Sequence, residues 1–374
     1  MPEYPGTEHE RRIAPEALTR QVAAIFAGCG MSREDAGWMA ESLVMADLRG
    51  VHSHGVLRVP EYVEKLLAKG VDPRGRPRIV KDNGAALVID GGNSMGQIGA
   101  AFAMRHAIER ARTANLGAAA VRGSNHCGAM FSYAMMALAE DMIGIATTNA
   151  LPTMAPWGGK DKIVGINPLA VAIPAGKEAP IVLDAAFSYS SHGKIRVFQQ
   201  KGYPIPSTWS FDEEGAPTTD TTKAIAGLLR PIGEYKGVGL AIVMGILASL
   251  LSGAGYGLES GNMVEGAIPG KDGHFFLAIR VAAFEEPRIF RRRVDGIIGE
   301  IRSSRPVDPL KEHAQAGAAR RDPASVLCAS RHLYAPGGLE AETEARYRRE
   351  GIPLNAETLS GLGAAEQRAA GRGA

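Results

Sequence analysis

The sequence predicts a mixed α/β fold in which a sheet-containing region lies between two helical segments. Three observations lead to this prediction. Apolar residues recur at helical spacing in residues 10–75, short strand-like apolar runs alternate with helical patterns in residues 76–284, and the charged tail of residues 285–374 is again helical in pattern. Alternation of this kind favours a sheet covered by helices.

The N-terminal segment is expected to form three helices. Gly28 and Gly30 end the first, and Ser32 with Asp35 three residues later marks the start of the second. The helices are predicted over Ala14–Ala27, from Ser32 to about Leu48, and from about His54 to Lys69.

The central region contains the predicted sheet. Its strands are expected at Ala85–Asp90, Ala118–Arg122, Ile143–Thr148, Leu169–Pro174, Pro180–Ala186 and His274–Arg280, and its helices at Gly99–Ala114, Met130–Asp141 and Lys194–Gln200. No strand here runs into a Gly-x-Gly-x-x-Gly pattern that opens a helix. A nicotinamide cofactor would therefore need a scaffold other than the usual dinucleotide-binding turn.

The segment Gly237–Leu258 carries no charge and is long enough to span a bilayer. Small residues recur in it every four positions, which gives a helix one smooth face. A single span in mid-chain with globular sequence behind it is the poorer interpretation. We therefore predict a buried core helix and no membrane association.

Composition narrows the function classes. The 42 basic and 40 acidic residues leave a net charge of +2, and the Arg-rich C-terminal region is interleaved with acids, so no nucleic-acid-binding stripe is expected. The three cysteines are widely spaced, and the N-terminus has no apolar signal core. These features predict a reducing compartment, and we expect a cytoplasmic protein.

The turn His52-Ser53-His54-Gly55 is the first candidate site. If a helix starts near His54, then His54, Arg58 and Tyr62 share one face and present an imidazole, a guanidinium and a phenol behind the Ser53 hydroxyl. Arginine suits a carboxylate, and histidine suits proton transfer near neutral pH. On spacing alone, an N-cap serine with surface Arg58 and Tyr62 explains the pattern equally well.

The second candidate is the stretch Gly123–Gly128, between a strand end and a helix start. His126 could act there as an acid or base, and Ser124 or Asn125 could meet a phosphate or carboxylate at the helix N-terminus. The alternative is a helix cap by Ser124 or Asn125, with His126 satisfied by the backbone.

Further candidates follow other strands: Thr148, Asn149 and Ala150 after one, Asp184, Ala185 and Ala186 after another, and His192 with Lys194 near a helix start. Each could contact a cofactor, the acid through ribose hydroxyls and the basic pair through a phosphate. Turn capping and solvent exposure remain open for all of them. No His-Glu-x-x-His or paired Cys/His spacing is present, so no metal site is predicted.

Taken together, these segments resemble a known family. The stretch DLRGVHSHGVLRVPEYVEKL resembles the N-terminal signature of the type-2 malate/L-lactate dehydrogenase family, which also contains ureidoglycolate and sulfolactate dehydrogenases and piperideine-2-carboxylate reductases. GSNHCGAM, IGIATTNALPTMAPWGGKDKIVGINPLAVAIPAG, PIVLDAAF, SHGKI, EYKGVGLA and GHFFLAI look like its later blocks in the same order. The match runs from about Ile13 to Leu354.

The resemblance implies a non-Rossmann, mostly antiparallel sheet that binds NAD or NADP, N- and C-terminal helical segments that pack together, homodimers or higher assemblies, and no metal. It implies that His126, which is catalytic together with His54, accepts the substrate's hydroxyl proton. It also implies that Ser53, His54, Arg58 and Tyr62 line the substrate and nicotinamide pocket. It also implies cofactor contacts from the blocks that hold Ser124, Asn125, Thr148, Asn149, Ala150 and Asp184–Ala186.

Several positions depart from the family pattern. Gly245 stands where relatives often have Glu, and the stretch Ala335–Gly338 lacks the usual Glu after Pro-Gly. An apparent insertion covers about Lys311–Ser330, and Phe187-Ser188-Tyr189 is bulkier than expected. These changes are expected to affect how the protein closes around the cofactor and the shape of the substrate pocket.

The predicted function is hydride transfer between a nicotinamide cofactor and a small 2-hydroxy or 2-keto acid of the malate or lactate kind. The alternative enzyme is an NADPH-dependent reductase of a cyclic imine such as piperideine-2-carboxylate. The hypotheses from other function classes are a metal-dependent hydrolase or lyase built on the histidines, and a non-catalytic scaffold.

Overall fold

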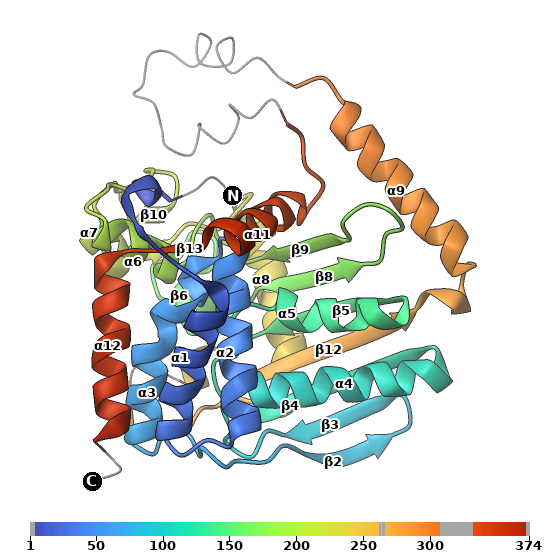
Figure 1. The fold of residues 1–374 in the computed structure, drawn as a ribbon, viewed down its shortest axis with the longest axis horizontal. Coiled ribbons are helices and arrows are strands. Elements are labelled where there is room, and N and C mark those ends of the chain that lie inside the picture. The colour runs from blue at the N-terminus through green and yellow to red at the C-terminus, as the bar shows by residue number, and fades with distance from the viewer. Residues whose placement is uncertain (1–3, 262, 264–265, 307–331, 372–374) are drawn as a thin grey trace.

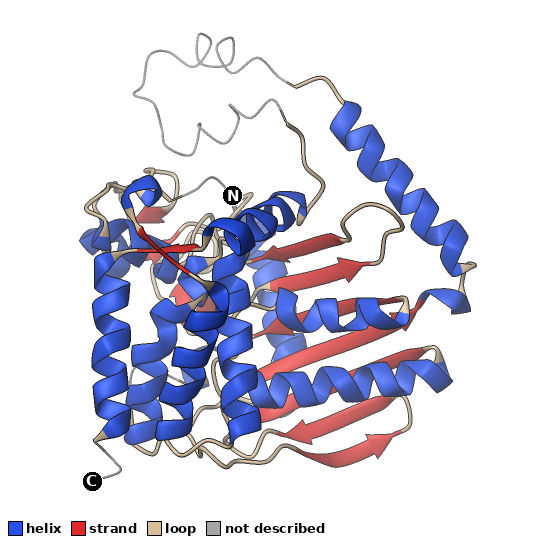
Figure 2. Ribbon diagram, viewed as in Figure 1, coloured by secondary structure: helices blue, strands red, loops and turns tan. Residues whose placement is uncertain are grey.

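The computed structural model describes residues 4–261, 263, 266–306 and 332–371. A bundle of helices from both ends of the chain stands beside a sheet that has helices on both faces (Figures 1 and 2). The bundle helices are α1 (Pro15–Gly28), α2 (Arg33–Leu48), α3 (Val59–Leu67) and α12 (Ala356–Ala370).

The main sheet has seven strands in the order β2-β3-β4-β12-β5-β8-β9. Only β3 and β4 run parallel, so the mostly antiparallel sheet is confirmed. The strands are β2 (Arg78–Asn83), β3 (Ala86–Asp90), β4 (Leu116–Ser124), β12 (Asp272–Arg280), β5 (Met142–Thr148), β8 (Leu169–Ile173) and β9 (Ile181–Ala185).

Small residues in the sheet let helices approach it closely. Helix α4 (Gly96–Ala114) packs on β4 and β12 from one face, and α8 (Tyr235–Ala248) packs on β5 and β12 from the other (Figure 1). In β4, a Cβ at Gly117 would lie 1.9 Å from the carbonyl oxygen of Ala107 in α4, so only glycine fits there. The helix–sheet contact therefore depends on the Gly/Ala composition of β4.

The helical bundle has its own apolar core, formed by residues such as Leu18, Phe26, Leu43 and Leu362. Strands from the two ends of the chain join beside it, because β1 (Arg11–Ile13) pairs with β13 (Ile352–Leu354). The predicted cap at the start of α2 is confirmed: the Ser32 hydroxyl accepts from the N–H of Asp35 at 3.0 Å.

The remaining elements connect these layers. The helices are α5 (Phe131–Ala134), α6 (His192–Gln200), α7 (Thr221–Ala226), α9 (Pro287–Ser303) and α11 (Gly338–Glu350). Two small antiparallel pairs are β6 (Pro152–Met154) with β7 (Val164–Gly165), and β10 (Ser210–Phe211) with β11 (Leu228–Leu229). The helix predicted over Met130–Asp141 is wrong in part, because α5 changes into 3₁₀ turns at Met135.

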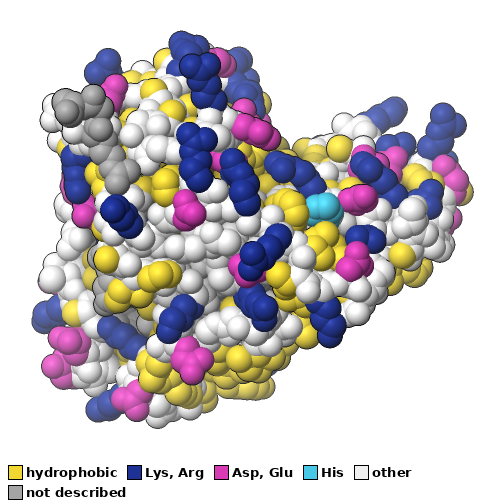
Figure 3. Space-filling model, turned by 90° about the horizontal axis from the view of Figure 1, so that it is seen from below, with side chains coloured by type: hydrophobic (Ala, Val, Ile, Leu, Met, Phe, Trp, Pro, Cys, Tyr) yellow, Lys and Arg dark blue, Asp and Glu magenta, His cyan; other side chains and the backbone are white. Residues whose placement is uncertain are grey.

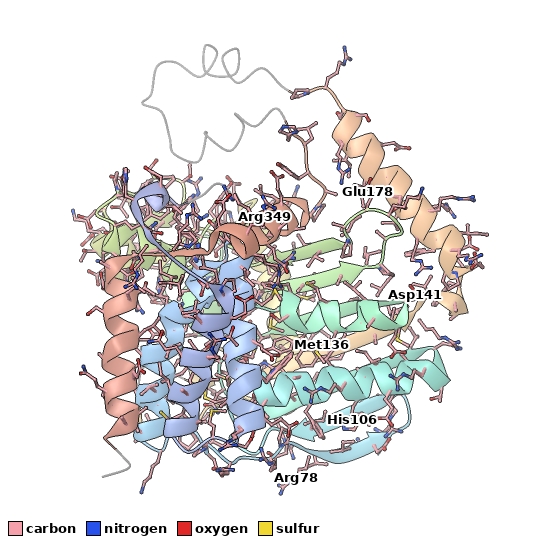
Figure 4. All side chains as sticks on the ribbon, viewed as in Figure 1. Arg78, His106, Met136, Asp141, Glu178 and Arg349 are labelled. Atoms are coloured by element: carbon pink, nitrogen blue, oxygen red, sulfur yellow. The ribbon has the colours of Figure 1, made fainter. Side chains whose placement is uncertain are left out.

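Helix α9 crosses the side of the sheet farthest from the bundle and is tied down by charged contacts (Figures 1 and 4). Arg302 pairs with Glu178 at 2.5 Å, and Arg291 pairs with Asp141 at 2.8 Å. The carboxylate of Asp295 accepts backbone N–H bonds from residues 176–178. The predicted loop at Ala314–Ala324, within the apparent insertion Lys311–Ser330, lies outside the described residues.

The predicted burial of α8 is only half correct. Its small residues face the sheet and are buried, among them Gly237, Ala241 and Gly245. Its large apolar residues face outward instead, with Leu240 48% and Val243 51% exposed. The two faces differ in side-chain size rather than in polarity, which the absence of charge could not reveal.

None of the described helices is long and apolar enough to cross a membrane. Basic and acidic side chains are mixed over the face seen from below, with apolar side chains gathered at its lower edge (Figure 3). Cys29 and Cys127 are buried free thiols, and Cys328 lies outside the described residues. The cytoplasmic location stays a prediction.

Candidate active site

The turn between α2 and α3 differs from the predicted one. No helix starts at His54; the chain makes two 3₁₀ turns, over His52–His54 and Val56–Arg58, before α3 begins at Val59. The expected stripe of imidazole, guanidinium and phenol on one helix face is therefore wrong as a geometry. Pro60, in the first turn of α3, is the sequence signal for the true start, because proline is tolerated there.

A buried carboxylate organises this turn. One oxygen of Asp47 accepts from His52 Nδ1 at 2.7 Å, and the other accepts from the backbone N–H of Val56 at 2.7 Å. A Cβ at Gly55 would lie 2.2 Å from this carboxylate, so a side chain has no room there. Asp47 thus holds the turn against the bundle.

The folded chain brings four predicted site residues together. The Tyr62 hydroxyl lies 2.7 Å from His126 Nδ1, and Gln97 donates to the same hydroxyl at 3.1 Å. The ring of His54 stacks on that of His126, with centroids 5.8 Å apart and planes 13° apart. Ser53 Oγ lies 3.0 Å from His54 Nδ1. Two segments that are distant in sequence thus form one cluster.

Both stacked imidazoles are held in the neutral form. Burial, followed by the positive charge of Arg58, lowers the pKa of His126 to about 3. The same two causes bring the pKa of His54 well below its usual value. An uncharged imidazole at neutral pH is able to accept a proton, which a general base requires.

The guanidinium of Arg58 is largely committed to protein groups. Its Nε donates to the carbonyl oxygen of Ser53 at 2.8 Å, and its Nη1 pairs with Glu61 at 2.8 Å. A Cβ at Gly193 would lie 2.4 Å from Nη2, so the first turn of α6 packs on it. A two-pronged grip on a substrate carboxylate is therefore not available in this conformation; only Nη2 has no hydrogen bond among the described residues.

A cavity of about 280 Å³ opens beside the cluster. Ser53 and His54 form part of its wall, and the end of β9 with the start of α6 forms another part. The lining residues from β9, α6 and the loop between them are Val182, Asp184, Ala185, Ala186, Ser188, Tyr189, Ser190, Ser191 and Lys194. Three of the predicted cofactor residues thus line the same space as Ser53 and His54.

Asp184 also has a structural role. Its carboxylate accepts from the backbone N–H of Phe131 at 2.8 Å, at the start of α5. Burial raises the pKa of this carboxyl to about 6. The capping role that the sequence left open is therefore present, and a contact with ribose hydroxyls stays a prediction.

Ser124 and Thr148 belong to a buried chain of hydrogen bonds through His274. Ser124 Oγ lies 2.8 Å from His274 Nε2, and Thr148 Oγ1 lies 2.8 Å from His274 Nδ1. These hydrogen bonds link β4, β12 and β5 near one end of each strand. Residue spacing did not indicate this role for His274, because the link depends on strand pairing.

Asn125, Asn149 and Ala150 are also bonded to the protein itself. Asn125 donates to the carbonyl oxygen of Ser94 at 2.8 Å, and Asn149 accepts from the N–H of Gly273 at 2.8 Å. The N–H of Ala150 donates to the side-chain amide oxygen of Asn167 at 2.8 Å. These three residues lie outside the described lining of the 280 Å³ cavity. Their contact with a cofactor stays a prediction.

His192 and Lys194 lie in the first turn of α6 rather than before it, and neither faces open solvent. Burial lowers the pKa of His192 to about 4. Lys194 lines the cavity with its ammonium 4.5 Å from the centroid of the Trp209 ring, and burial lowers its pKa to about 8. Among the described residues, no carboxylate pairs with this ammonium.

The part of the chain that the structure describes has no cluster of three or more His, Cys, Asp or Glu side chains placed to hold a metal. Gln97 is a polar residue at the site that the sequence analysis did not single out. Gln97 sits among apolar residues of a helix, and no local pattern distinguishes it.

The chain matches known proteins along most of its length. Residues 13–326 match the family described as malate/L-lactate dehydrogenase. A malate dehydrogenase of Pyrococcus abyssi is 37% identical over 309 residues, covering 80% of this chain and 84% of that protein. The chain therefore belongs to the malate/L-lactate dehydrogenase family.

Two further relatives have a cofactor in their names. A (2R)-3-sulfolactate dehydrogenase (NADP(+)) of Chromohalobacter salexigens is 35% identical, covering 72% of this chain and 81% of that protein. A ureidoglycolate dehydrogenase (NAD(+)) of Escherichia coli O157:H7 is 30% identical, covering 79% and 84%. The solved sulfolactate dehydrogenase of Methanocaldococcus jannaschii superposes with a TM-score of 0.83 and 31% identity over 96% of this chain and 97% of that one.

Proposed function

We propose that this chain is an NAD(P)-dependent dehydrogenase that moves a hydride between a nicotinamide cofactor and a small 2-hydroxy or 2-keto acid. The observation that carries the proposal is the neutral His126, bonded to Tyr62 through Nδ1 and stacked on His54 beside the cavity. Among the described residues, His126 Nε2 has no hydrogen-bond partner. That nitrogen is left to meet the substrate.

In the oxidative direction, His126 Nε2 takes the proton of the substrate hydroxyl while the hydride leaves the alpha carbon. Ser53 and His54 orient the oxygen, and Arg58 Nη2 meets the carboxylate. The nicotinamide ring, when bound, supplies the hydride acceptor. In the reductive direction, the proton returns from His126 to the oxygen of the 2-keto acid. The protein contributes chiefly position and a base of suitable protonation state.

The cavity lining fits a nicotinamide cofactor. Ala185 and Ala186 at the end of β9 leave room for a flat ring, and the hydroxyls of Ser188, Ser190 and Ser191 offer donors and acceptors to an amide or a ribose. The names of two relatives, one with NAD(+) and one with NADP(+), support this class of cofactor.

We further infer that Lys194 receives a second anionic group of the substrate. A buried ammonium without a carboxylate partner is costly, and an anion in the cavity would relieve that cost. Lys194 shares the cavity with Ser53 and His54, where the reacting carbon would lie. Malate and sulfolactate, which occur in the names of relatives, both carry a second anion.

A substrate panel tests the proposal. We expect reduction of NAD or NADP, followed by absorbance, with malate and sulfolactate, and weaker turnover with lactate. Ureidoglycolate and, in the reductive direction with NADPH, piperideine-2-carboxylate complete the panel. Absence of turnover with every hydroxy acid would refute the proposal, and efficient reduction of the imine alone would favour the cyclic-imine alternative.

Lys194→Met separates the substrate contact from a cofactor contact. We expect KM for malate to rise roughly ten- to a hundredfold, as for the loss of one charge-assisted hydrogen bond, with little change for lactate. Because the ammonium is charged only below its pKa of about 8, wild-type kcat/KM for malate should fall above that pH. This fall should be absent from the pH profile of the variant. Lys223→Met, at an exposed position, is the control. A rise in cofactor KM instead would show that Lys194 serves the cofactor.

We also propose a homodimer or higher homo-oligomer that forms through α8. Its outer face exposes Leu240 and Val243, and the turn that follows it exposes Leu250 and Leu251, each between 48% and 55%. An uncharged apolar stripe of this kind is typical of a surface that another protein covers, and it is complementary to a second copy of itself.

Val243→Glu should shift the particle mass toward the monomer, because it places a charge in the middle of the apolar stripe. Light scattering after gel filtration measures this mass. Ile297→Glu, on α9 with a similar exposure of 52%, is the matched control and should leave the mass unchanged. An unaltered mass for Val243→Glu would rule α8 out as the contact.

A further inference from the structure

Gln97 is a fully buried polar residue beside the site that the mechanism above does not use. It lies in the first turn of α4, and its Nε2 donates to the Tyr62 hydroxyl at 3.1 Å. Its Oε1 is buried and has no hydrogen-bond partner among the described residues. A buried amide with one half unpaired is costly, so the direction in which it points has consequences.

The hydrogen bonds around Tyr62 determine where His126 carries its proton. With the Gln97 amide donating to Tyr62, the single hydroxyl proton goes to His126 Nδ1. The N–H of Gly128 also points at Nδ1, at 3.3 Å. Two donors aimed at Nδ1 leave that nitrogen bare, so the neutral ring holds its proton on Nε2. In this form His126 cannot take a proton from a substrate at Nε2.

A half-turn of the Gln97 amide reverses the chain of bonds. Oε1 then accepts the Tyr62 hydroxyl proton, and the Tyr62 oxygen accepts from His126 Nδ1–H, which leaves Nε2 bare; the 3.3 Å hydrogen bond from the Gly128 N–H to Nδ1 is given up. The amide oxygen and nitrogen have almost the same size and shape, so this change needs no movement of the backbone. Trp38 Nε1 donates to the Gln97 carbonyl oxygen at 3.0 Å and keeps that backbone in place.

We infer that Gln97 is a positioning residue that selects, through Tyr62, which ring nitrogen of His126 carries the proton. The state with Oε1 on Tyr62 is the one competent for catalysis. During oxidation, Nε2 gains the substrate proton while Nδ1–H remains bonded to Tyr62; during reduction, the same proton leaves Nε2. Neither Tyr62 nor Gln97 gains or loses a proton overall. The catalytic part of this inference rests on the proposed function, whereas the tautomer part does not.

Two substitutions at Gln97 test the inference by kinetics. In Gln97→Met, the Tyr62 proton has only His126 as acceptor, so we expect kcat for oxidation to fall roughly tenfold with little change in KM, as for one hydrogen bond. In Gln97→Glu, the carboxylate only accepts once it is ionised, so most of the activity should return above the pKa of this carboxyl, which burial raises. Its negative charge should also move the acidic limb of the pH profile upward by about one unit.

The charged and titratable groups around His126 remain the same in both variants: Arg58, His54 and His274 act on it directly, and Lys65 and Asp272 share a small cavity with it. In a Tyr62→Phe background, the activities of Gln97→Met and Gln97→Glu should no longer differ, because the hydroxyl that links residue 97 to His126 is absent. Gln199→Met, at an exposed position, is the control. Equal losses in the two variants, with or without Tyr62 and with no shift of the pH profile, would reduce Gln97 to a packing role.

Ring ¹⁵N chemical shifts separate this inference from the proposed function, because they need no turnover. The signal of His126 is assigned by its loss in His126→Gln. We expect a larger Nδ1–H population in Gln97→Glu than in Gln97→Met, and equal populations would overturn the inference. A population shift in a protein that oxidises no hydroxy acid would uphold the inference and refute the proposed function alone.

Discussion

Replacement of His126 by alanine is expected to lower kcat for hydroxy-acid oxidation by on the order of a hundredfold or more, as loss of a general base does. The imidazole is neutral, its Nδ1 is bonded to the Tyr62 hydroxyl, and its Nε2 has no partner among the described residues. Steady-state rates at saturating cofactor measure the effect.

Two comparisons make this result specific. Cofactor binding, followed by nicotinamide fluorescence, should persist in His126→Ala, because the ring lies outside the described lining of the 280 Å³ cavity. His106→Ala removes an imidazole that pairs with Glu109 on α4 and should leave kcat unchanged. Near-wild-type turnover in His126→Ala would remove this residue from the mechanism.

Gly96→Ala is expected to have the second-largest effect, because Gly96 touches the backbone that carries His126. A Cβ there would lie 2.0 Å from the carbonyl oxygen of Asn125 and 2.5 Å from that of His126. The loop must move to admit it, and a displacement of about 1 Å in a reacting group costs roughly a hundredfold in rate. Overpacking should also lower the free energy of unfolding by about 1–3 kcal/mol.

Gly37→Ala is the matched control, since a Cβ at this position of α2 meets nothing within 4 Å. It should raise the free energy of unfolding by about 0.5–1 kcal/mol, because alanine is the better helix former, and leave kcat unchanged. Thermal unfolding and steady-state rates on the two variants measure both effects. Unchanged kcat in Gly96→Ala would mean that the loop relaxes without moving His126.

Local chemistry made several features of the fold predictable. The cap of Ser32 on Asp35 and the small-residue face of α8 were visible in the sequence, because each depends on residues within a few turns of one helix. The start of α3 was missed although Pro60 marked it. Local signals thus located most elements and were less reliable at their ends.

The site could be predicted only as a set of separate residues. The contact between Tyr62 and His126 joins α3 to the loop after β4, and no periodicity relates two such positions. The family resemblance supplied their common role before the structure supplied their geometry. Neither the residue pattern nor the family resemblance predicted the roles of Gln97 and His274. Their hydrogen bonds depend on tertiary packing across α4 and across three strands.

The pairing of β1 with β13 bears on how the protein is made. Residues 11–13 find their partner strand at residues 352–354, and α12 closes the bundle against α1 and α3. During synthesis the chain leaves the ribosome from its N-terminus, so the turn that carries Ser53 and His54 waits for almost the whole sequence before its bundle closes. The candidate active site is therefore expected to be among the last parts of the molecule to be completed, and a chain interrupted late in translation would carry an incomplete site.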